Sequence, residues 1–99
     1  MPFRWMPPEA LRRHRFSEKS DVWAFAVTGW ELLAGGDVPY SFIETNEEVH
    51  HRVVAGERLE RPEGCPDAIW EALSRCWADR PEERPTFAEL AVDLARIEV

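Results

Sequence analysis

The stretch from Ser17 to Ala34 constrains the fold of this chain most strongly, because it is long and predominantly apolar. Ser17 or Ser20 can cap its start, and the glycines at 35 and 36 favour a helix end. Its apolar residues are Val22, Trp23, Phe25, Ala26, Val27, Trp30, Leu32 and Leu33. They cover nearly the whole circumference of a helix, and a helix that is apolar on all sides is buried on all sides. We therefore expect a central helix in a larger helical assembly.

Four shorter helices are predicted around this central helix. Prolines and glycines divide the chain so that helices fall at about 7–12, at 45–56, at 67–78 and from residue 86 onward. The segments that start at Thr45 and Thr86 each fit a capping box, with glutamate three residues later. The connection 79–85 and the loop 61–66 are rich in proline. No segment is typical of a strand, so the predicted fold class is all-α with five helices.

The shorter helices have too little apolar surface to enclose the central helix. The last of them carries a single apolar stripe, made of Phe87, Leu90, Leu94 and Ile97. Part of each such stripe is used in packing the short helices against one another. We therefore expect an uncovered apolar face, and a patch of more than a few hundred Å² usually marks a partner surface. This pattern indicates that the 99 residues are part of a larger body.

Composition excludes several classes of function. The net charge of −7 repels phosphate groups, which argues against a nucleic-acid partner and against contact with anionic membranes. No apolar run approaches the ~18 residues of a membrane span, and the start has no secretory pattern, so we expect a cytoplasmic segment. Cys65 and Cys76 are expected to be reduced core residues, with a bridge or zinc site as the alternative. The basic patch Arg12–Arg15 is predicted to be a solvated loop, with a docking site as the alternative.

Four motifs in sequence order carry a resemblance to a known family. They are RWMPPEAL, FSEKSDVWAFAVTGWELLAGGDVPY, RPEGCP and RCWADRPEERPTFAEL. Together they resemble the last part of a protein tyrosine kinase catalytic domain, of the receptor type in particular. The resemblance spans residues 1–99 and implies the C-terminal portion of the kinase large lobe. It also allows the cytoplasmic side of a membrane receptor as a location.

The resemblance assigns the first residues to substrate binding. Residues 2–9 resemble the end of a kinase activation segment, in which Pro7-Pro8-Glu9 stands at the Ala-Pro-Glu signature. Pro2, Phe3, Arg4 and Trp5 would form a shelf for the substrate segment beside the tyrosine that is phosphorylated. Pro2 would pack against the tyrosine ring, while Arg4 and Trp5 would hold the shape of the shelf. The alternatives are a frayed terminus and an arginine resting on an indole ring.

The resemblance also implies structural roles for four residues. Glu9 would form a buried ion pair with Arg84, shielded by aromatic and proline side chains. Asp21 would accept hydrogen bonds from the backbone of the catalytic loop, which this chain does not contain. Trp23 would pack in the core of the lobe. The alternative for both acids is a charge that favours a helix start.

The chemistry that the family performs needs groups that these 99 residues lack. Phosphoryl transfer requires a glycine-rich loop, a lysine–glutamate pair, a catalytic-loop aspartate and a magnesium-binding aspartate. We find none of these motifs and expect no catalytic, nucleotide-binding or metal-binding residue in the chain. ATP and Mg²⁺ would belong to the complete domain. Two hypotheses remain: part of a tyrosine kinase with a tyrosine-containing protein substrate, or a non-catalytic helical module that binds another kinase lobe.

Overall fold

The computed structural model describes residues 3–97. Within this range the secondary structure is helical and contains no strand, as the sequence predicts. The elements are the 3₁₀ helix η1 (Phe3–Trp5), α1 (Pro8–Arg13), α2 (Glu18–Leu33), α3 (Asn46–Val54), α4 (Asp67–Arg75), the 3₁₀ helix η2 (Pro81–Glu83) and α5 (Phe87–Ala95). The five α-helices match the predicted segments, whereas the two 3₁₀ helices were not foreseen.

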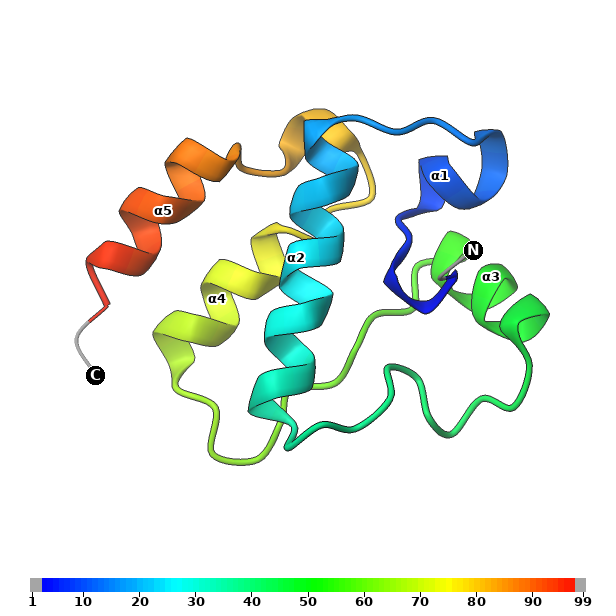
Figure 1. Ribbon diagram of the computed structural model, residues 1–99, viewed down its shortest axis with the longest axis horizontal. Coiled ribbons are helices and arrows are strands. Elements are labelled where there is room, and N and C mark those ends of the chain that lie inside the picture. Colours follow the sequence, from blue (N-terminus) through cyan, green and yellow to red (C-terminus); the bar gives the residue numbers. More distant parts are fainter. Residues whose placement is uncertain (1–2, 98–99) are drawn as a thin grey trace.

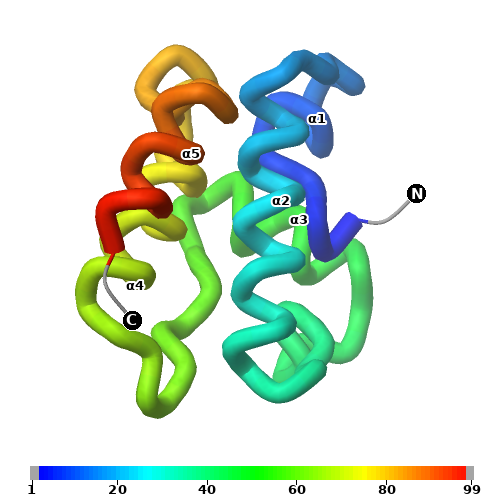
Figure 2. Tube along the Cα trace, turned by 60° about the vertical axis from the view of Figure 1, so that its left-hand side comes forward, coloured from blue at the N-terminus to red at the C-terminus, as the bar shows by residue number. Residues whose placement is uncertain are grey.

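Helix α2 stands in the middle of the molecule and separates two groups of elements (Figure 1). The helices α4 and α5 lie on one side of it, and η1, α1 and α3 lie on the other. A second view keeps the same division, with α5 and α4 together at the left (Figure 2). The expected central position of α2 is therefore confirmed.

The helix starts are fixed by local hydrogen bonds. Ser17 caps α2 and Ser20 completes a capping box, so both serines contribute to the start. Thr86 and Glu89 form the predicted capping box of α5. Thr45 accepts a hydrogen bond from the backbone N–H of Glu48, but the Glu48 carboxylate binds Arg52 at 3.1 Å. Each side-chain cap satisfies a backbone N–H that would otherwise lack a partner at the helix end.

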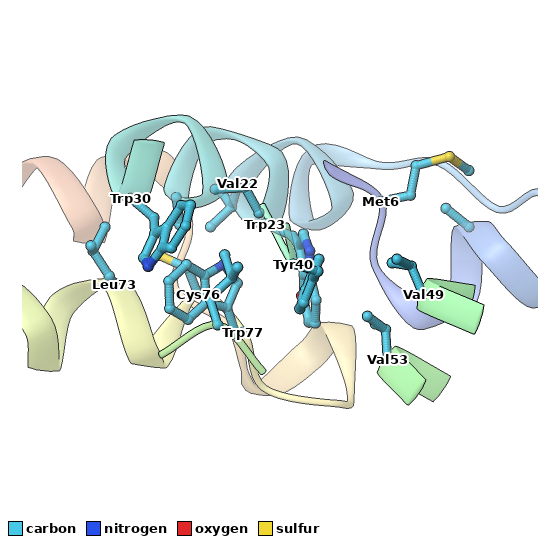
Figure 3. Close-up of a cluster of buried hydrophobic side chains, with 14 of the residues drawn as sticks. Met6, Val22, Trp23, Trp30, Tyr40, Val49, Val53, Leu73, Cys76 and Trp77 are labelled. Carbon is cyan, nitrogen blue, oxygen red and sulfur yellow. The ribbon is translucent and has the colours of Figure 1, made fainter. Parts of the chain in front are cut away.

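The hydrophobic core lies along one side of α2 (Figure 3). Trp23, Trp30 and Trp77 gather there, together with Tyr40 and Cys76, and all five side chains are buried. The valines of α3 extend the same cluster toward η1 and α1. Aromatic side chains bury large areas each, so a small number of them supplies much of the apolar contact of this short chain.

The opposite side of α2 corrects the expectation that the helix is buried all round. Asp21, Phe25, Thr28 and Leu32 are exposed and lie along one stripe of the helix, with exposed fractions of 48% for Phe25 and 80% for Leu32. The polar residues in this stripe make α2 less uniform than the apolar count suggests. The predicted uncovered apolar face is confirmed, and it continues onto α5 through the edge-to-face contact of Phe25 with Phe87.

The last two helices depart from prediction in detail. Helix α4 ends at Arg75, so Cys76 and Trp77 lie in the following turn and not in the helix. They are buried nonetheless, because the turn folds them under α2. In α5 only Leu90 of the predicted apolar stripe is fully buried, while Phe87 and Leu94 remain exposed. The apolar pattern of α5 therefore adds to the uncovered face.

Candidate functional site

The side chain of Arg4 holds the first described residues against the loop that follows α2. Its Nη1 donates to the carbonyl oxygens of Pro39 and Tyr40, at 2.9 and 2.8 Å. Its Nη2 donates to the carbonyl oxygen of Ile43 at 2.8 Å. Hydrogen bonds from a charged donor each contribute about 1.5–3 kcal/mol. Arg4 therefore fixes this segment through backbone carbonyls, and no cation–π contact of Arg4 occurs among the described residues.

Trp5 ties the same segment to the central helix. Its indole Nε1 donates to Glu31 Oε1 at 2.6 Å. The rings of Phe3 and Trp5 are half-buried and pack against the core, and η1 touches both α2 and α3. Residues 3–5 are thus an integral part of the fold and not a frayed end, whereas Pro2 lies outside the described residues. Phe3, Arg4 and Trp5 therefore lie together in a short segment that is held firmly by hydrogen bonds and core contacts.

Glu9 and Arg84 form an ion pair across 75 positions of sequence. Nη1 of Arg84 lies 2.7 Å from Glu9 Oε2, and Nη2 lies 2.8 Å from Glu9 Oε1. The Arg84 side chain is fully buried, and that of Glu9 is 16% exposed. This two-pronged geometry matches the planar guanidinium to the carboxylate and gives the strong form of such a pair. It joins the end of the first segment to the connection before α5.

The remaining donors of Arg84 are also satisfied. Its Nε donates to the carbonyl oxygen of Ala78 at 2.9 Å, while Nη1 and Nη2 donate to those of Lys19 and Asp79, each at 3.2 Å. All five N–H groups of the guanidinium therefore have an acceptor. A buried charge is tolerated only when it is paired and hydrogen-bonded in this way.

Trp23 lies beside this ion pair and is only 1% exposed. The guanidinium of Arg84 lies over its ring at 4.9 Å, and that of Arg58 lies over it at 4.8 Å. Cation–π contacts in desolvated surroundings contribute about 2 kcal/mol or more. Trp23 is therefore a core residue, and it also supports the arginine that holds Glu9.

Arg58 is the residue of this region that sequence reasoning missed. It donates to the carbonyl oxygens of Trp77 at 2.8 Å and Val53 at 3.1 Å, and it lies 3.8 Å from Asp79. Burial lowers the pKa of its guanidinium from the usual value. Its acceptors are mainly backbone carbonyls. Because every residue has a backbone carbonyl, the amino-acid sequence does not show which residues bind this arginine. No motif could have pointed to it.

The start of α2 is fastened to the same connection. Lys19 Nζ donates to the carbonyl oxygen of Arg84 at 2.6 Å, and Glu18 Oε1 accepts from the backbone N–H of Phe87 at 3.1 Å. Asp21, which is also in the first turn of α2, is exposed and forms no ion pair with any residue in the range 3–97. The structure therefore keeps Asp21 apart from the Glu9–Arg84 pair, and its carboxylate faces solvent on the uncovered stripe.

The hydrogen bonds and the ion pair described above hold the segment 3–9 against α2 and the connection before α5. The described residues bring together no group of three His, Cys, Asp or Glu side chains that could hold a metal ion. Cys65 and Cys76 are free and buried, and desolvation raises the pKa of the Cys76 thiol to about 11. A thiol with so high a pKa is a poor nucleophile. No helix in this part of the chain is long and apolar enough to cross a membrane.

The fold is helical around α2, and its N-terminal segment is held in place by Arg4 and Glu9. These features are consistent with one class of protein, which comparison with known families identifies. Residues 1–94 match the family described as protein tyrosine and serine/threonine kinase. The chain belongs to this family, and its all-helical structure is that of a part of the kinase large lobe.

Several curated tyrosine kinases resemble the chain individually. It is 44% identical over 94 residues to inactive tyrosine-protein kinase 7 of Gallus gallus, a match that covers 95% of this chain and 9% of that protein. It is 47% identical over 87 residues to proto-oncogene tyrosine-protein kinase ROS of Mus musculus, covering 88% of the chain and 4% of the relative. Tyrosine-protein kinase transforming protein RYK of avian retrovirus RPL30 is 40% identical over 97 residues, at 98% and 22% coverage. The chain thus spans less than a quarter of each relative.

Proposed function

We propose that residues 1–99 are the substrate-binding lower part of a protein tyrosine kinase domain. The complete domain would use ATP and Mg²⁺ to phosphorylate tyrosine residues of proteins in the cytoplasm. The observation that carries the proposal is the anchoring of the N-terminal segment at both ends. Arg4 binds three loop carbonyls on one side, and Glu9 binds the buried Arg84 on the other.

This anchoring suits a segment that must position a substrate. Phosphoryl transfer depends on placing the acceptor hydroxyl accurately, because the reaction asks little covalent chemistry of the protein. A segment held by backbone carbonyls and a buried ion pair presents a fixed surface to a peptide. The names of the relatives favour tyrosine as the acceptor, since three of them are called tyrosine-protein kinases.

The 99 residues would not transfer phosphate by themselves. The sequence contains no glycine-rich loop, no His-Arg-Asp and no Asp-Phe-Gly motif. We expect purified chain to show no ATP turnover above background. Turnover that follows the protein through purification and is lost in a Glu9→Ala variant would contradict this expectation.

A second candidate function is a non-catalytic interaction module. The name of one relative, inactive tyrosine-protein kinase 7, favours it, because a kinase-like lobe can evidently be kept without that activity. In this reading the exposed stripe of α2 would bind another kinase lobe. The first candidate instead places a peptide substrate beside the anchored N-terminal segment, and activity in a complete domain separates the two candidates.

A chimera tests the proposal directly. The chain would replace the matched 87 residues of mouse kinase ROS, and phosphorylation of tyrosine and serine peptides would be measured. We expect tyrosine phosphorylation, and we expect Arg4→Ala to raise the KM for peptide more than it lowers kcat. Arg96→Ala, an exposed arginine at the end of α5, is the matched control and should leave both constants unchanged. A chimera that folds but phosphorylates only serine would refute tyrosine as the acceptor.

A further inference from the structure

A cleft lined by four arginines lies beside α1. It has a volume of about 550 Å³, which is in the range of ligand-binding clefts. Arg12, Arg13 and Arg15 line it from the end of α1 and the following loop, together with Phe16. Asp79, Arg80 and Glu82 line it from the connection before α5, and Glu9 lines it from α1. The cleft therefore joins two parts of the chain that are far apart in sequence.

The three arginines from the α1 side have no acidic partner. Arg12, Arg13 and Arg15 form no ion pair with any residue between 3 and 97. By contrast, six other arginines do form ion pairs: Arg52, Arg58, Arg61, Arg75, Arg80 and Arg84. The chain as a whole carries a net charge of −7, so acids to pair with are abundant. The acids that line the cleft are paired with other arginines: Glu9 with Arg84, Asp79 with Arg58 and Glu82 with Arg80. The positive charges of Arg12, Arg13 and Arg15 are therefore left without an acidic partner at this cleft.

Local structure accounts for only part of this charge. Arg12 and Arg13 lie in the last turn of α1, where cations favour the helix dipole. Arg12 also donates to the carbonyl oxygen of Val54 at 3.3 Å. Arg15 lies beyond the helix end, after His14 turns the chain through the left-handed region with a φ of 53°. Phe16 follows and is 58% exposed, which leaves a large apolar ring at the rim of a charged cleft.

We propose that this cleft binds an acidic peptide segment, with successive carboxylates on the arginines and one large apolar side chain against Phe16. Guanidinium groups pair with carboxylates through two parallel hydrogen bonds, so three of them match a short run of acids. The charges are spread along residues 12–15, which suits several carboxylates better than one concentrated phosphate. A long polyanion such as nucleic acid is repelled by the rest of the molecule. The proposal does not depend on catalysis, nor on the substrate shelf.

Fluorescence anisotropy with the 99-residue chain tests the proposal. The probe is a labelled pool of peptides with a fixed glutamate run followed by leucine, and the control pool has glutamine in place of glutamate. We expect the acidic pool to bind and the glutamine pool to bind at least about tenfold more weakly. Added salt should weaken binding, since exposed charges are screened. A phosphotyrosine peptide without glutamates serves as a competitor and is expected to compete poorly.

Matched variants locate the binding. Arg15→Glu should weaken acidic-pool binding by about tenfold, because it turns an attraction into a repulsion. Phe16→Ser should weaken the binding of acidic peptides that end in leucine. It should have less effect on the binding of acidic peptides in which glycine replaces that leucine. Arg96→Glu makes the same change of charge at an exposed arginine away from the cleft and should leave binding unchanged. Circular dichroism is used to check that each variant keeps its helices.

Several results would overturn the proposal. It is wrong if neither pool binds, or if the two pools bind equally. It is also wrong if Arg15→Glu and Arg96→Glu have the same effect, because binding would then follow overall charge. Stronger binding of the phosphotyrosine peptide than of the acidic pool would assign the cleft to a different ligand.

Discussion

Arg84 is a buried cation whose five N–H groups all have acceptors, and Glu9 supplies two of them. The resemblance to kinases made this pair predictable from sequence, because both residues stand within recognisable motifs. The contacts that support it were not predictable. Lys19 and Arg58 act mainly through backbone carbonyls, and a carbonyl is present at every position of a chain. The sequence can therefore predict an ion pair between two charged side chains within motifs, but it rarely predicts a charged side chain that binds backbone carbonyls.

The ion pair leads to a prediction about stability. Glu9→Gln would strand the buried Arg84 charge, and breaking a buried pair in this way costs about 3–5 kcal/mol. Since small domains have about 5–15 kcal/mol of stability in total, the variant should be severely weakened. The free energy of unfolding is measured by urea denaturation. Glu82→Gln, which removes an exposed partner of Arg80, is the control and should change the midpoint hardly at all.

Tyr40 gives a prediction about alkaline pH. Burial raises the pKa of its phenol from 10.0 to about 12. The folded state thus favours the neutral phenol. Its contribution to stability is complete below pH 10 and is lost as pH rises toward about 12. Tyr40 is the only tyrosine, so the ultraviolet absorbance of tyrosinate reports on it alone. Tyr40→Phe should lose less stability over this interval, and an ordinary titration near pH 10 in folded protein would contradict the account.

At the scale of elements, the five helices were predictable from their caps and breakers, while their faces were not. The capping signals of Ser17 and Thr86 stand in the sequence and appear in the structure. The exposed stripe of α2 was hidden because Phe25 and Leu32 count as apolar wherever they point. The end of α4 was misjudged because Cys76 and Trp77 keep helical spacing although they lie in a turn. Apolar residues at helical spacing therefore indicate which side chains are buried, but they do not by themselves show that the segment is a helix.

The capping box of α5 yields an element-scale prediction. Thr86→Ala removes the side-chain acceptor for the backbone N–H of Glu89, which lies 3.1 Å from Thr86 Oγ1. The loss of such a cap costs about 1 kcal/mol. Thr28→Ala is the control, because Thr28 is exposed within α2 and alanine has the higher helix propensity. Thermal unfolding should show a lower midpoint for the first variant and an equal or higher one for the second. Equal losses in both would argue against the cap.

At the scale of the whole molecule, the core and the uncovered face share one helix. Trp23 and Trp30 of α2 are buried on one side, while Phe25 and Leu32 face solvent on the other. Exposed apolar surface of this kind favours association with a partner. We infer that a complete kinase large lobe would place further elements against α2, which would account for this arrangement. Sequence could predict that a face would be uncovered, but not which residues form it.

This surface makes a prediction about the isolated chain. We expect it to bind an apolar dye and to self-associate, because Phe25, Leu32 and Phe87 are exposed together. Phe25→Ser combined with Leu32→Ser should reduce both effects without loss of helix content. Analytical ultracentrifugation and dye fluorescence provide the measurements. Strong dye binding that is unchanged in the double variant would place the exposed apolar surface elsewhere.

We infer that other elements of a complete kinase lobe cover the exposed stripe of α2, and thiol labelling of a Leu32→Cys variant measures whether they do. Leu32 is 80% exposed here, while the natural cysteines Cys65 and Cys76 are buried and should react slowly. We expect rapid labelling of the new thiol in the isolated chain at dilutions that keep it monomeric, and strong protection in the chimera with kinase ROS. Equally rapid labelling in both proteins would show that the stripe faces water in the complete domain and would contradict the account.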